Sequence, residues 1–253
     1  MGHISGKSIV ITGASRGIGA AAARHLAQLG GKVILAARTI DAITEIAREI
    51  EDAGGTARAL ACDVAQASQV QALIDTAVKE QGGLDLLVNN AGLIDPIARL
   101  EESDPDAWGH IVDVNLKGVY YGMRFGIPAM AGAGTVINIS SGAATGALEG
   151  WSHYCATKAA VLSLTRCGHK EHGEKGITVV GLSPGTVATE MQVQIKASGI
   201  NPVSQLDPGV HIPPEWVAQA IAYLAGPGGQ AHAGGDFSMK TAEGRAALGL
   251  PAP

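Results

Sequence analysis

The sequence is poor in cysteine and has no long apolar run. Its three cysteines, Cys62, Cys155 and Cys167, form no CxxC pair, so we expect free thiols in a reducing compartment. No segment approaches the roughly 18 unbroken apolar residues that would span a membrane. The first residues, MGHISGKSIVITG, also lack the basic region, apolar core and cleavage site of a signal peptide. We therefore expect a soluble cytoplasmic protein with no membrane partner.

Charged and aromatic residues are scarce as well. Charged residues make up 16% of the chain and apolar residues 46%, a balance that supports a large buried core and argues against disorder. Aromatic residues are 4% while glycine occurs 35 times, which suits tight turns and close packing of helices on a sheet. The net charge is −5, and Lys and Arg are scattered, so we expect no nucleic-acid partner.

Apolar runs alternate with helical patterns almost to the end of the chain. The run KSIVITG is nearly continuous in apolar residues, as expected of a strand buried on both faces. Strands are expected near residues 7–13, 32–38, 57–64, 84–92, 134–141, 176–185 and 234–240. The pattern predicts an α/β fold in which one Rossmann-like, doubly wound domain covers residues 1–253. Its parallel sheet of about seven strands is flanked by helices.

Helical periodicity fills most segments between these strands. Asp104 stands before Pro105, an arrangement that predicts the capped start of a long helix. Residues 152–172 form another expected helix. Residues 186–212 lose the pattern and contain Pro and Gly, which suits a mobile loop over a site, and we expect this loop to select the substrate.

A glycine-rich turn, TGASRGIG, follows the first expected strand and opens the first helix. Gly13 permits a sharp turn, Gly17 lets the backbone approach a phosphate, and Gly19 lets the helix pack close to the strand. The helix N-terminus then offers free N–H groups and a positive dipole end to a pyrophosphate. This context predicts dinucleotide binding.

Tyr154 and Lys158 stand four residues apart in an expected helix, so they project side by side. Taken alone, this spacing is also typical of an exposed helix whose lysine extends along the surface. A phenol has an unperturbed pKa near 10, and a neighbouring ammonium favours the phenolate. The pair is therefore a candidate acid–base group in which Tyr154 carries the proton.

The motifs TGASRGIG, NNAG, YCATK and SPGTVATEM, together with Ser141, resemble those of the classical short-chain dehydrogenases/reductases. They occur in the family's order and span nearly the whole chain, and Ser141 precedes Tyr154 by the family's spacing. The resemblance implies an enzyme that moves a hydride between a nicotinamide cofactor and a small-molecule carbonyl or secondary alcohol.

The same resemblance implies roles for four catalytic residues. Tyr154 is the general acid–base, and Ser141 donates a hydrogen bond to the substrate oxygen. Lys158 lowers the pKa of the tyrosine and binds the nicotinamide ribose, while Asn115 holds a water that links Lys158 to solvent. Strand alternation would point the adjacent Ser140 to the opposite face. We also expect His153, beside Tyr154, to border the substrate pocket.

The cofactor contacts follow from the resemblance in the same way. Asp63 is expected to accept a bond from the adenine amino group beside Val64, with an ordinary turn cap as the alternative reading. Asn89 steadies the sheet near the adenosine ribose. The expected cofactor-binding residues are Gly13, Ser15, Arg16, Gly17, Ile18, Gly19, Arg38, Asp63, Val64, Asn89, Ala91, Gly92, Tyr154, Lys158, Pro184, Gly185, Val187 and Thr189.

The choice of dinucleotide is a question of charge. An NAD enzyme places an acid at the end of the second strand, where it binds the ribose 2′-OH. Here that strand ends in Ala37 and Arg38, and Arg16 lies inside the glycine turn. Two guanidinium groups suit the 2′-phosphate of NADP, so we predict NADP. The alternative is that both arginines face solvent and the cofactor is NAD.

The sequence also leaves rival functions open and departs from the family pattern at some positions. The rivals are an NAD-dependent secondary-alcohol or polyol dehydrogenase and a catalytically idle nucleotide sensor. His169 and His172 lack a third ligand, so we predict no metal site. Val180 stands where relatives often carry Asn, and the chain end lacks the common tail with an aspartate and two glycines. The resemblance implies a homo-oligomer, and because that tail often helps form tetramers in relatives, both a dimer and a tetramer stay open.

Overall fold

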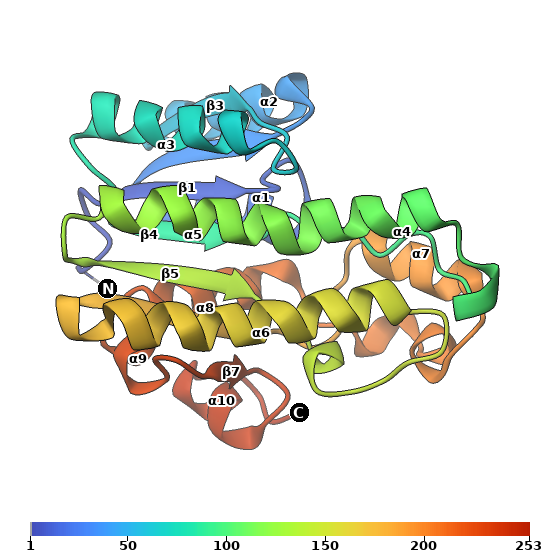
Figure 1. Ribbon diagram of the computed structural model, residues 1–253. Coiled ribbons are helices and arrows are strands. Elements are labelled where there is room, and N and C mark those ends of the chain that lie inside the picture. Colours follow the sequence, from blue (N-terminus) through green and yellow to red (C-terminus); the bar gives the residue numbers. More distant parts are fainter. Residues whose placement is uncertain (1) are drawn as a thin grey trace.

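A seven-stranded parallel sheet forms the centre of the computed structural model, which describes residues 2–253 (Figure 1). Its strands are β1 (Ser8–Thr12), β2 (Lys32–Ala37), β3 (Thr56–Ala61), β4 (Leu86–Asn89), β5 (Gly134–Ile139), β6 (Ile177–Ser183) and β7 (Asp236–Ser238). They are ordered β3-β2-β1-β4-β5-β6-β7, and each neighbouring pair is parallel. The order reverses between β1 and β4, which creates the crevice where ligands of such sheets bind. The predicted doubly wound α/β fold is confirmed.

Helices cover both faces of this sheet. They are α1 (Gly17–Gln28), α2 (Ile40–Asp52), α3 (Ala67–Gln81), α4 (Pro105–Val112), α5 (Gly118–Ala129), α6 (Ser152–His172), α7 (Glu190–Ser198), α8 (Pro214–Leu224), α9 (Pro227–Ala231) and α10 (Ala242–Ala247). One core cluster joins the sheet to α1, α2 and α8, and another joins its opposite face to α3, α5 and α6. Figure 1 shows α5 and α6 running side by side across the front of the sheet. No helix within residues 2–253 is long and apolar enough to cross a membrane.

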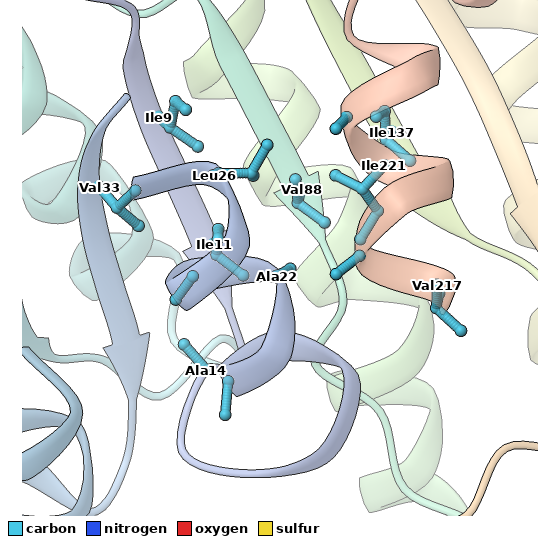
Figure 2. Close-up of a cluster of buried hydrophobic side chains, with 14 of the residues drawn as sticks. Ile9, Ile11, Ala14, Ala22, Leu26, Val33, Val88, Ile137, Val217 and Ile221 are labelled. Carbon is cyan, nitrogen blue, oxygen red and sulfur yellow. The ribbon is translucent and has the colours of Figure 1, made fainter. Parts of the chain in front are cut away.

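Strand alternation decides which core each side chain joins. Ile9 and Ile11 of β1 face α1 and α8, where Figure 2 shows them among Leu26 and Ile221. Val10, between them, belongs to the opposite cluster. The side chains of Ile9, Val10 and Ile11 are all fully buried. Full burial of such a side chain stabilises a fold by roughly 1.5–3 kcal/mol. The strand is thus held rigidly on both faces.

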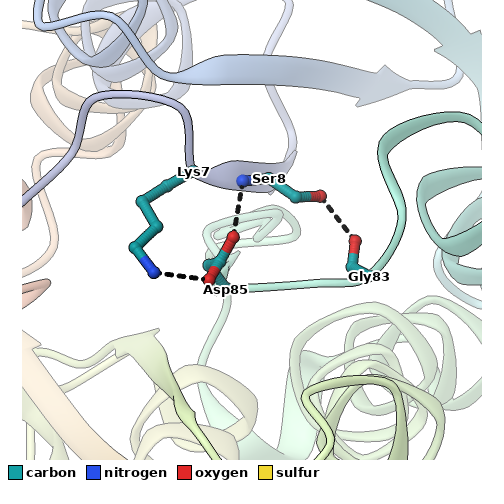
Figure 3. Close-up of polar contacts among 4 residues, drawn as sticks. All are labelled: Lys7, Ser8, Gly83 and Asp85. Carbon is teal, nitrogen blue, oxygen red and sulfur yellow. Dashed lines mark hydrogen bonds and ion pairs between the residues drawn. The ribbon is translucent and has the colours of Figure 1, made fainter.

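A polar clamp fixes β1 to the segment before β4 at the amino ends of the strands (Figure 3). The N–H of Ser8 donates to Asp85 Oδ2 at 2.8 Å, and Ser8 Oγ donates to the carbonyl of Gly83 at 2.6 Å. The ammonium of Lys7 pairs with Asp85 Oδ1 at 2.8 Å. These contacts join the two strands between which the order reverses, at the end remote from their carboxyl ends.

Two segments differ from the sequence prediction. The long helix begins as predicted, because Asp104 Oδ1 accepts from the N–H of Ala107 at 2.8 Å and Pro105 is its first residue. It is interrupted between α4 and α5 by a π-helical segment, Asp113–Lys117. Residues 186–212 are not a plain loop, since they contain α7. Only Ile195 of α7 is buried, so its sequence carries little of the periodicity that reveals a helix.

Candidate active site

A cleft of about 850 Å³ opens at the carboxyl ends of the strands. It brings together the glycine turn, the ends of β2 to β6, the start of α6 and the segment after β6. The predicted cofactor-binding residues that line it are Gly13, Ser15, Arg16, Gly17, Ile18, Arg38, Asp63, Val64, Ala91, Gly92, Tyr154, Lys158, Pro184, Gly185, Val187 and Thr189. Within residues 2–253, Gly19, Asn89 and Asn115 lie behind this lining.

The glycine turn is held in place by the turn after β4. Gly13 has a φ of +64°, and a Cβ at this position would lie 2.7 Å from Ala91 Cα. Asn90 Nδ2 donates to the carbonyls of Thr12 and Gly13, at 2.9 and 3.0 Å, and Thr12 Oγ1 accepts from the N–H of Asn90 at 3.0 Å. The two turns therefore form one unit. Neither Asn90 nor Thr12 was among the predicted site residues, although the NNAG motif contained the signal.

The start of α1 suits a phosphate. Its N-cap, Arg16, has an extended backbone, and its side chain makes no capping bond among the described residues. The first N–H groups of the helix are thus left to a ligand, and the helix dipole favours an anion there. Together with the close approach at Gly13, this geometry fits the pyrophosphate of a dinucleotide.

Arg16 and Arg38 border the same end of the cleft. Both are exposed, and neither forms a salt bridge within residues 2–253. The position at the end of β2 where an acid would bind a ribose 2′-OH holds Ala37. Arg16 and Arg38 thus bring two positive side chains to the cleft lining, to which Asp63 contributes a carboxylate.

Asp63 lines the cleft and also organises its own turn. Its Oδ1 accepts from the N–H of Ala65 at 3.0 Å, while its N–H donates to Gln69 Oε1 at 2.8 Å. The turn-capping alternative is thus present in the structure. The same carboxylate borders the cleft beside Val64, so the cap also orients it toward a ligand.

Asn89 is part of a buried polar chain beneath the cleft. Its Nδ2 donates to Asn138 Oδ1 at 2.8 Å, and Asn138 Nδ2 donates to Thr165 Oγ1 at 2.9 Å. These bonds join β4, β5 and α6. Asn89 therefore joins the strands beneath the cleft and does not line it, so its role in cofactor binding stays a prediction.

Tyr154 and Lys158 project from the first turns of α6 into the cleft. Their side chains are nearly buried, with exposed fractions of 8% and 5%. Lys158 Nζ lies 5.5 Å from the centroid of the Tyr154 ring and donates to the carbonyl of Ile139 at 2.7 Å. The predicted side-by-side placement is present, and the exposed-helix alternative does not fit such burial.

Burial dominates the proton affinities of this pair. It raises the pKa of Tyr154 to about 12, against a hydrogen bond from Ser141 that acts in the opposite direction. It lowers the pKa of Lys158 to about 8, while the charge of Asp236 acts to raise it. We expected the ammonium to lower the pKa of the phenol. The net direction is the opposite, because both groups lose water on burial and their neutral forms are favoured.

Ser141 and Ser140 follow β5 and face different surroundings. Ser141 lies in the cleft beside Tyr154 and caps a short 3₁₀ turn, accepting from the N–H of Ala143 at 3.2 Å. Ser140 Oγ instead donates to Asp236 Oδ2 at 3.2 Å. The alternation expected for these two serines is therefore observed.

His153 and Asn115 support the segment after NNAG. His153 is 1% exposed and hydrogen-bonds the carbonyl of Ile94 at 2.7 Å, so it lies behind the cleft instead of bordering it as expected. Asn115, in the π-helical segment, accepts from the N–H of Leu93 and donates to its carbonyl, both at 2.8 Å. The visible role of the Asn115 side chain is to fix this backbone, and its water-binding role stays a prediction.

The wall beyond Tyr154 and Ser141 is apolar. It is a cluster of buried and half-buried side chains from the NNAG segment, α6, α7 and the turns between them. Its main members are Ile94, Ala143, Leu148, Trp151, Met191, Ile195 and Val203. The Trp151 ring meets the Tyr154 ring edge-on, with 5.6 Å between centroids. This end of the cleft suits an apolar molecule.

The fold and the glycine turn place the protein among the doubly wound α/β proteins that bind ligands beyond the carboxyl ends of their strands. Residues 7–199 match the family model described as short chain dehydrogenase. The chain belongs to this family. It is an oxidoreductase that uses a nicotinamide cofactor, NAD or NADP, and acts between CH–OH and C=O groups.

Relatives and solved structures agree with this assignment. The chain is 33% identical over 223 residues to a cyclohexanol dehydrogenase of Acinetobacter sp. (strain SE19), covering 86% of this chain and 87% of that protein. It is 37% identical over 219 residues to a cis-4-hydroxycyclohexanecarboxylate dehydrogenase of Sinomonas cyclohexanicum, covering 85% and 88%. A variant actinorhodin polyketide ketoreductase, solved with NADPH, superposes with a TM-score of 0.85 at 28% identity, covering 94% and 96%.

Proposed function

We propose that the protein is an NADP-dependent oxidoreductase that interconverts a carbonyl and a secondary alcohol through Ser141, Tyr154 and Lys158, supported by Asn115. The observation that carries the proposal is that one cleft is lined by these three side chains and also by Arg16 and Arg38, two arginines that form no salt bridge within residues 2–253. The start of α1, whose N-cap side chain makes no capping bond, lines the same cleft.

Different residues of the cleft would bind different parts of the dinucleotide. The free N–H groups at the start of α1 would hold the pyrophosphate, and Arg16 and Arg38 would hold the 2′-phosphate. Asp63 and Val64 would contact the adenine. The remaining lining residues of the segment after β6 would hold the nicotinamide part of the cofactor: Pro184, Gly185, Val187 and Thr189.

Chemistry at the other end is proton transfer and charge stabilisation. The bound dinucleotide supplies or accepts the hydride. In reduction, Tyr154 gives its proton to the carbonyl oxygen, and its raised pKa keeps it protonated at neutral pH. Ser141 donates to the same oxygen as negative charge grows on it. Lys158 carries its charge below a pH of about 8, stabilises the phenolate that remains and binds the nicotinamide ribose.

The apolar wall points to a substrate with a compact hydrocarbon body. Trp151, Leu148 and Met191 offer contact area but no charge to such a molecule. Two relatives are named for six-membered-ring alcohols, and this supports an alicyclic secondary alcohol or ketone as the substrate class.

The test is a panel of ketones and alcohols with NADPH, NADH and their oxidised forms, followed at the absorbance band of the reduced nicotinamide. We expect turnover of alicyclic ketones with NADPH. If NADH alone supported turnover, the cofactor part of the proposal would be wrong. If neither supported turnover although both bound, the protein would be a nucleotide sensor.

Location and assembly extend the proposal. We infer a cytoplasmic homo-oligomer, a dimer or a tetramer, from the free thiols and from the resemblance. Sedimentation equilibrium of the purified protein tests the assembly, and a monomer at all concentrations would refute it.

A further inference from the structure

A half-buried carboxylate lies behind the catalytic residues, on the face of the sheet that α6 covers. Asp236, the first residue of β7, stands opposite Gly181 of β6, and Gly181 stands opposite Asn138 of β5. Ser183 Oγ donates to Asp236 Oδ2 at 2.7 Å, and Ser140 Oγ donates to the same oxygen at 3.2 Å. Asp236 thus links β7 to the carboxyl ends of β6 and β5.

The neighbouring strand leaves room for this carboxylate. A Cβ at Gly181 would lie 2.7 Å from Asp236 Oδ1, so any larger residue there would displace the carboxylate. Oδ1 is buried, and within residues 2–253 it has no hydrogen-bond partner. A buried carboxylate oxygen without a partner costs free energy unless positive charge lies nearby.

The positive charge comes from α6. Burial raises the pKa of Asp236, while the hydroxyls of Ser183 and Ser140 and the charges of Lys158 and Arg166 act in the opposite direction. Within residues 2–253, these groups that favour the ionised carboxylate come from β6, from the segment after β5 and from α6. In return, the charge of Asp236 acts on Lys158.

The carboxylate also borders the backbone that places the catalytic residues. Ser140 stands between Ile139, whose carbonyl accepts the bond from Lys158 Nζ, and Ser141. The N–H of Ser140 is tied to the carbonyl of Leu182 at 2.8 Å. A change at Asp236 therefore affects the proton affinity of Lys158 through its charge. It also affects the position of Ser141 through the backbone of Ser140.

We propose that Asp236 is a positioning residue of the active site. Its carboxylate holds Ser140 and Ser183 together behind the catalytic face, and its negative charge keeps Lys158 in the ammonium form that the site needs. The inference rests on the proposed function, because it assigns to Lys158 the role given there.

The negative charge of Asp236 is needed to keep Lys158 protonated. Burial lowers the pKa of Lys158 to about 8, and the charge of Asp236 already acts against this fall. Without the carboxylate the pKa falls further, since an opposite charge in a low-dielectric site favours the charged form. Lys158 would then lose its proton near neutral pH, together with its ability to stabilise the phenolate.

The first experiment measures the proton affinity of Lys158 without substrate or cofactor. Purified protein is labelled at a series of pH values with trace acetic anhydride, with which a lysine reacts only in its neutral amine form, and the acetylation of each lysine is quantified by mass spectrometry. Exposed Lys32 serves as the internal reference. In Asp236→Asn, we expect the labelling of Lys158 relative to Lys32 at pH 6.5 to rise by about threefold or more. Unchanged relative labelling in a folded variant would overturn the proposal.

The second experiment uses turnover. The alkaline limb of kcat/KM in the reductive direction should move to lower pH in Asp236→Asn, with kcat at pH 6 largely retained. Loss of activity by the same factor at every pH would mean that Asp236 is only structural. An inactive wild-type protein would defeat the proposed function but leave the labelling result valid.

Gly181→Ala is the matched variant. It keeps the carboxylate but pushes it out of place, because the new Cβ would meet Oδ1. We expect the labelling of Lys158 to change in the same direction and by less than in Asp236→Asn. If Asp236→Asn does not fold, this variant and Ser183→Ala, which removes the 2.7 Å bond, carry the test. Wild-type labelling in both would refute the proposal.

Discussion

Tyr154 is the residue on which the proposed chemistry depends most directly. Tyr154→Phe keeps the ring that packs edge-on against Trp151 and removes only the oxygen that carries the proton. We expect turnover to fall by about 10² or more, as for the loss of a general acid–base group. Binding of NADPH, measured by fluorescence titration, should persist. A fall of less than about fivefold would require another proton donor.

Arg38 decides the cofactor in this proposal. It is exposed at the end of β2, next to Ala37, and within residues 2–253 it forms no salt bridge. The wild-type protein should bind NADPH at least tenfold more tightly than NADH, about 1.4 kcal/mol. Arg38→Asp should reverse the preference, because a carboxylate repels the 2′-phosphate and accepts from a 2′-OH. Equal dissociation constants in the wild type would contradict the assignment.

At the scale of elements, the glycine turn after β1 and the NNAG turn after β4 depend on each other for their conformation. Asn90 Nδ2 donates to two carbonyls of the glycine turn, those of Thr12 and Gly13. Asn90→Asp would replace this donor with a carboxylate that faces both carbonyls. We expect a loss of about 2–3 kcal/mol in stability, the range for buried groups left unpaired, and weaker cofactor binding.

Chemical denaturation and NADPH titration of Asn90→Asp check this. Asn89→Asp, one residue away, is the control: it disturbs the polar chain toward Asn138 and not the glycine turn. Equal effects on cofactor binding in the two variants would show that the turn contact is not specific.

The sequence predicted features that are set within a short segment and missed features that depend on the folded packing or on residues distant in sequence. The glycine turn and the spacing of Tyr154 and Lys158 are set within one turn of chain, so their placement was predictable. The π-helical segment and α7 were missed because neither has a distinct apolar period. Asp236 was missed because its partners, Ser140 and Ser183, lie 96 and 53 residues away along the chain. The raised pKa of Tyr154 was missed because burial is a property of the folded packing.

On the scale of the whole molecule, Lys158 makes stability depend on pH. Its pKa falls from 10.5 to about 8 on folding, so the unfolded chain binds more protons between these values. The free energy of unfolding should therefore rise by about 3 kcal/mol as pH rises across this window. Below pH 8 the cost of burying the ammonium is fully present.

Lys158→Met should lack this rise. We expect the variant to be more stable than the wild type at pH 7, and the difference to shrink between pH 8 and 10.5. Urea unfolding of both proteins at intervals of one pH unit measures it, and other titrating groups cancel in the comparison. A constant difference across the window would show that Lys158 is not buried as an ammonium.

Arg16 and Arg38 have a further consequence that concerns rates. The protein carries a net charge of −5, yet these two exposed cations line the cleft and form no salt bridge in the part of the chain that the structure describes. A phosphorylated dinucleotide approaching the cleft would be attracted locally while the rest of the surface repels it. At 0.1 M salt this attraction is screened beyond roughly 10 Å. Raising the ionic strength should therefore slow the association of NADPH more than that of NADH, so the preference for NADPH would itself weaken with salt.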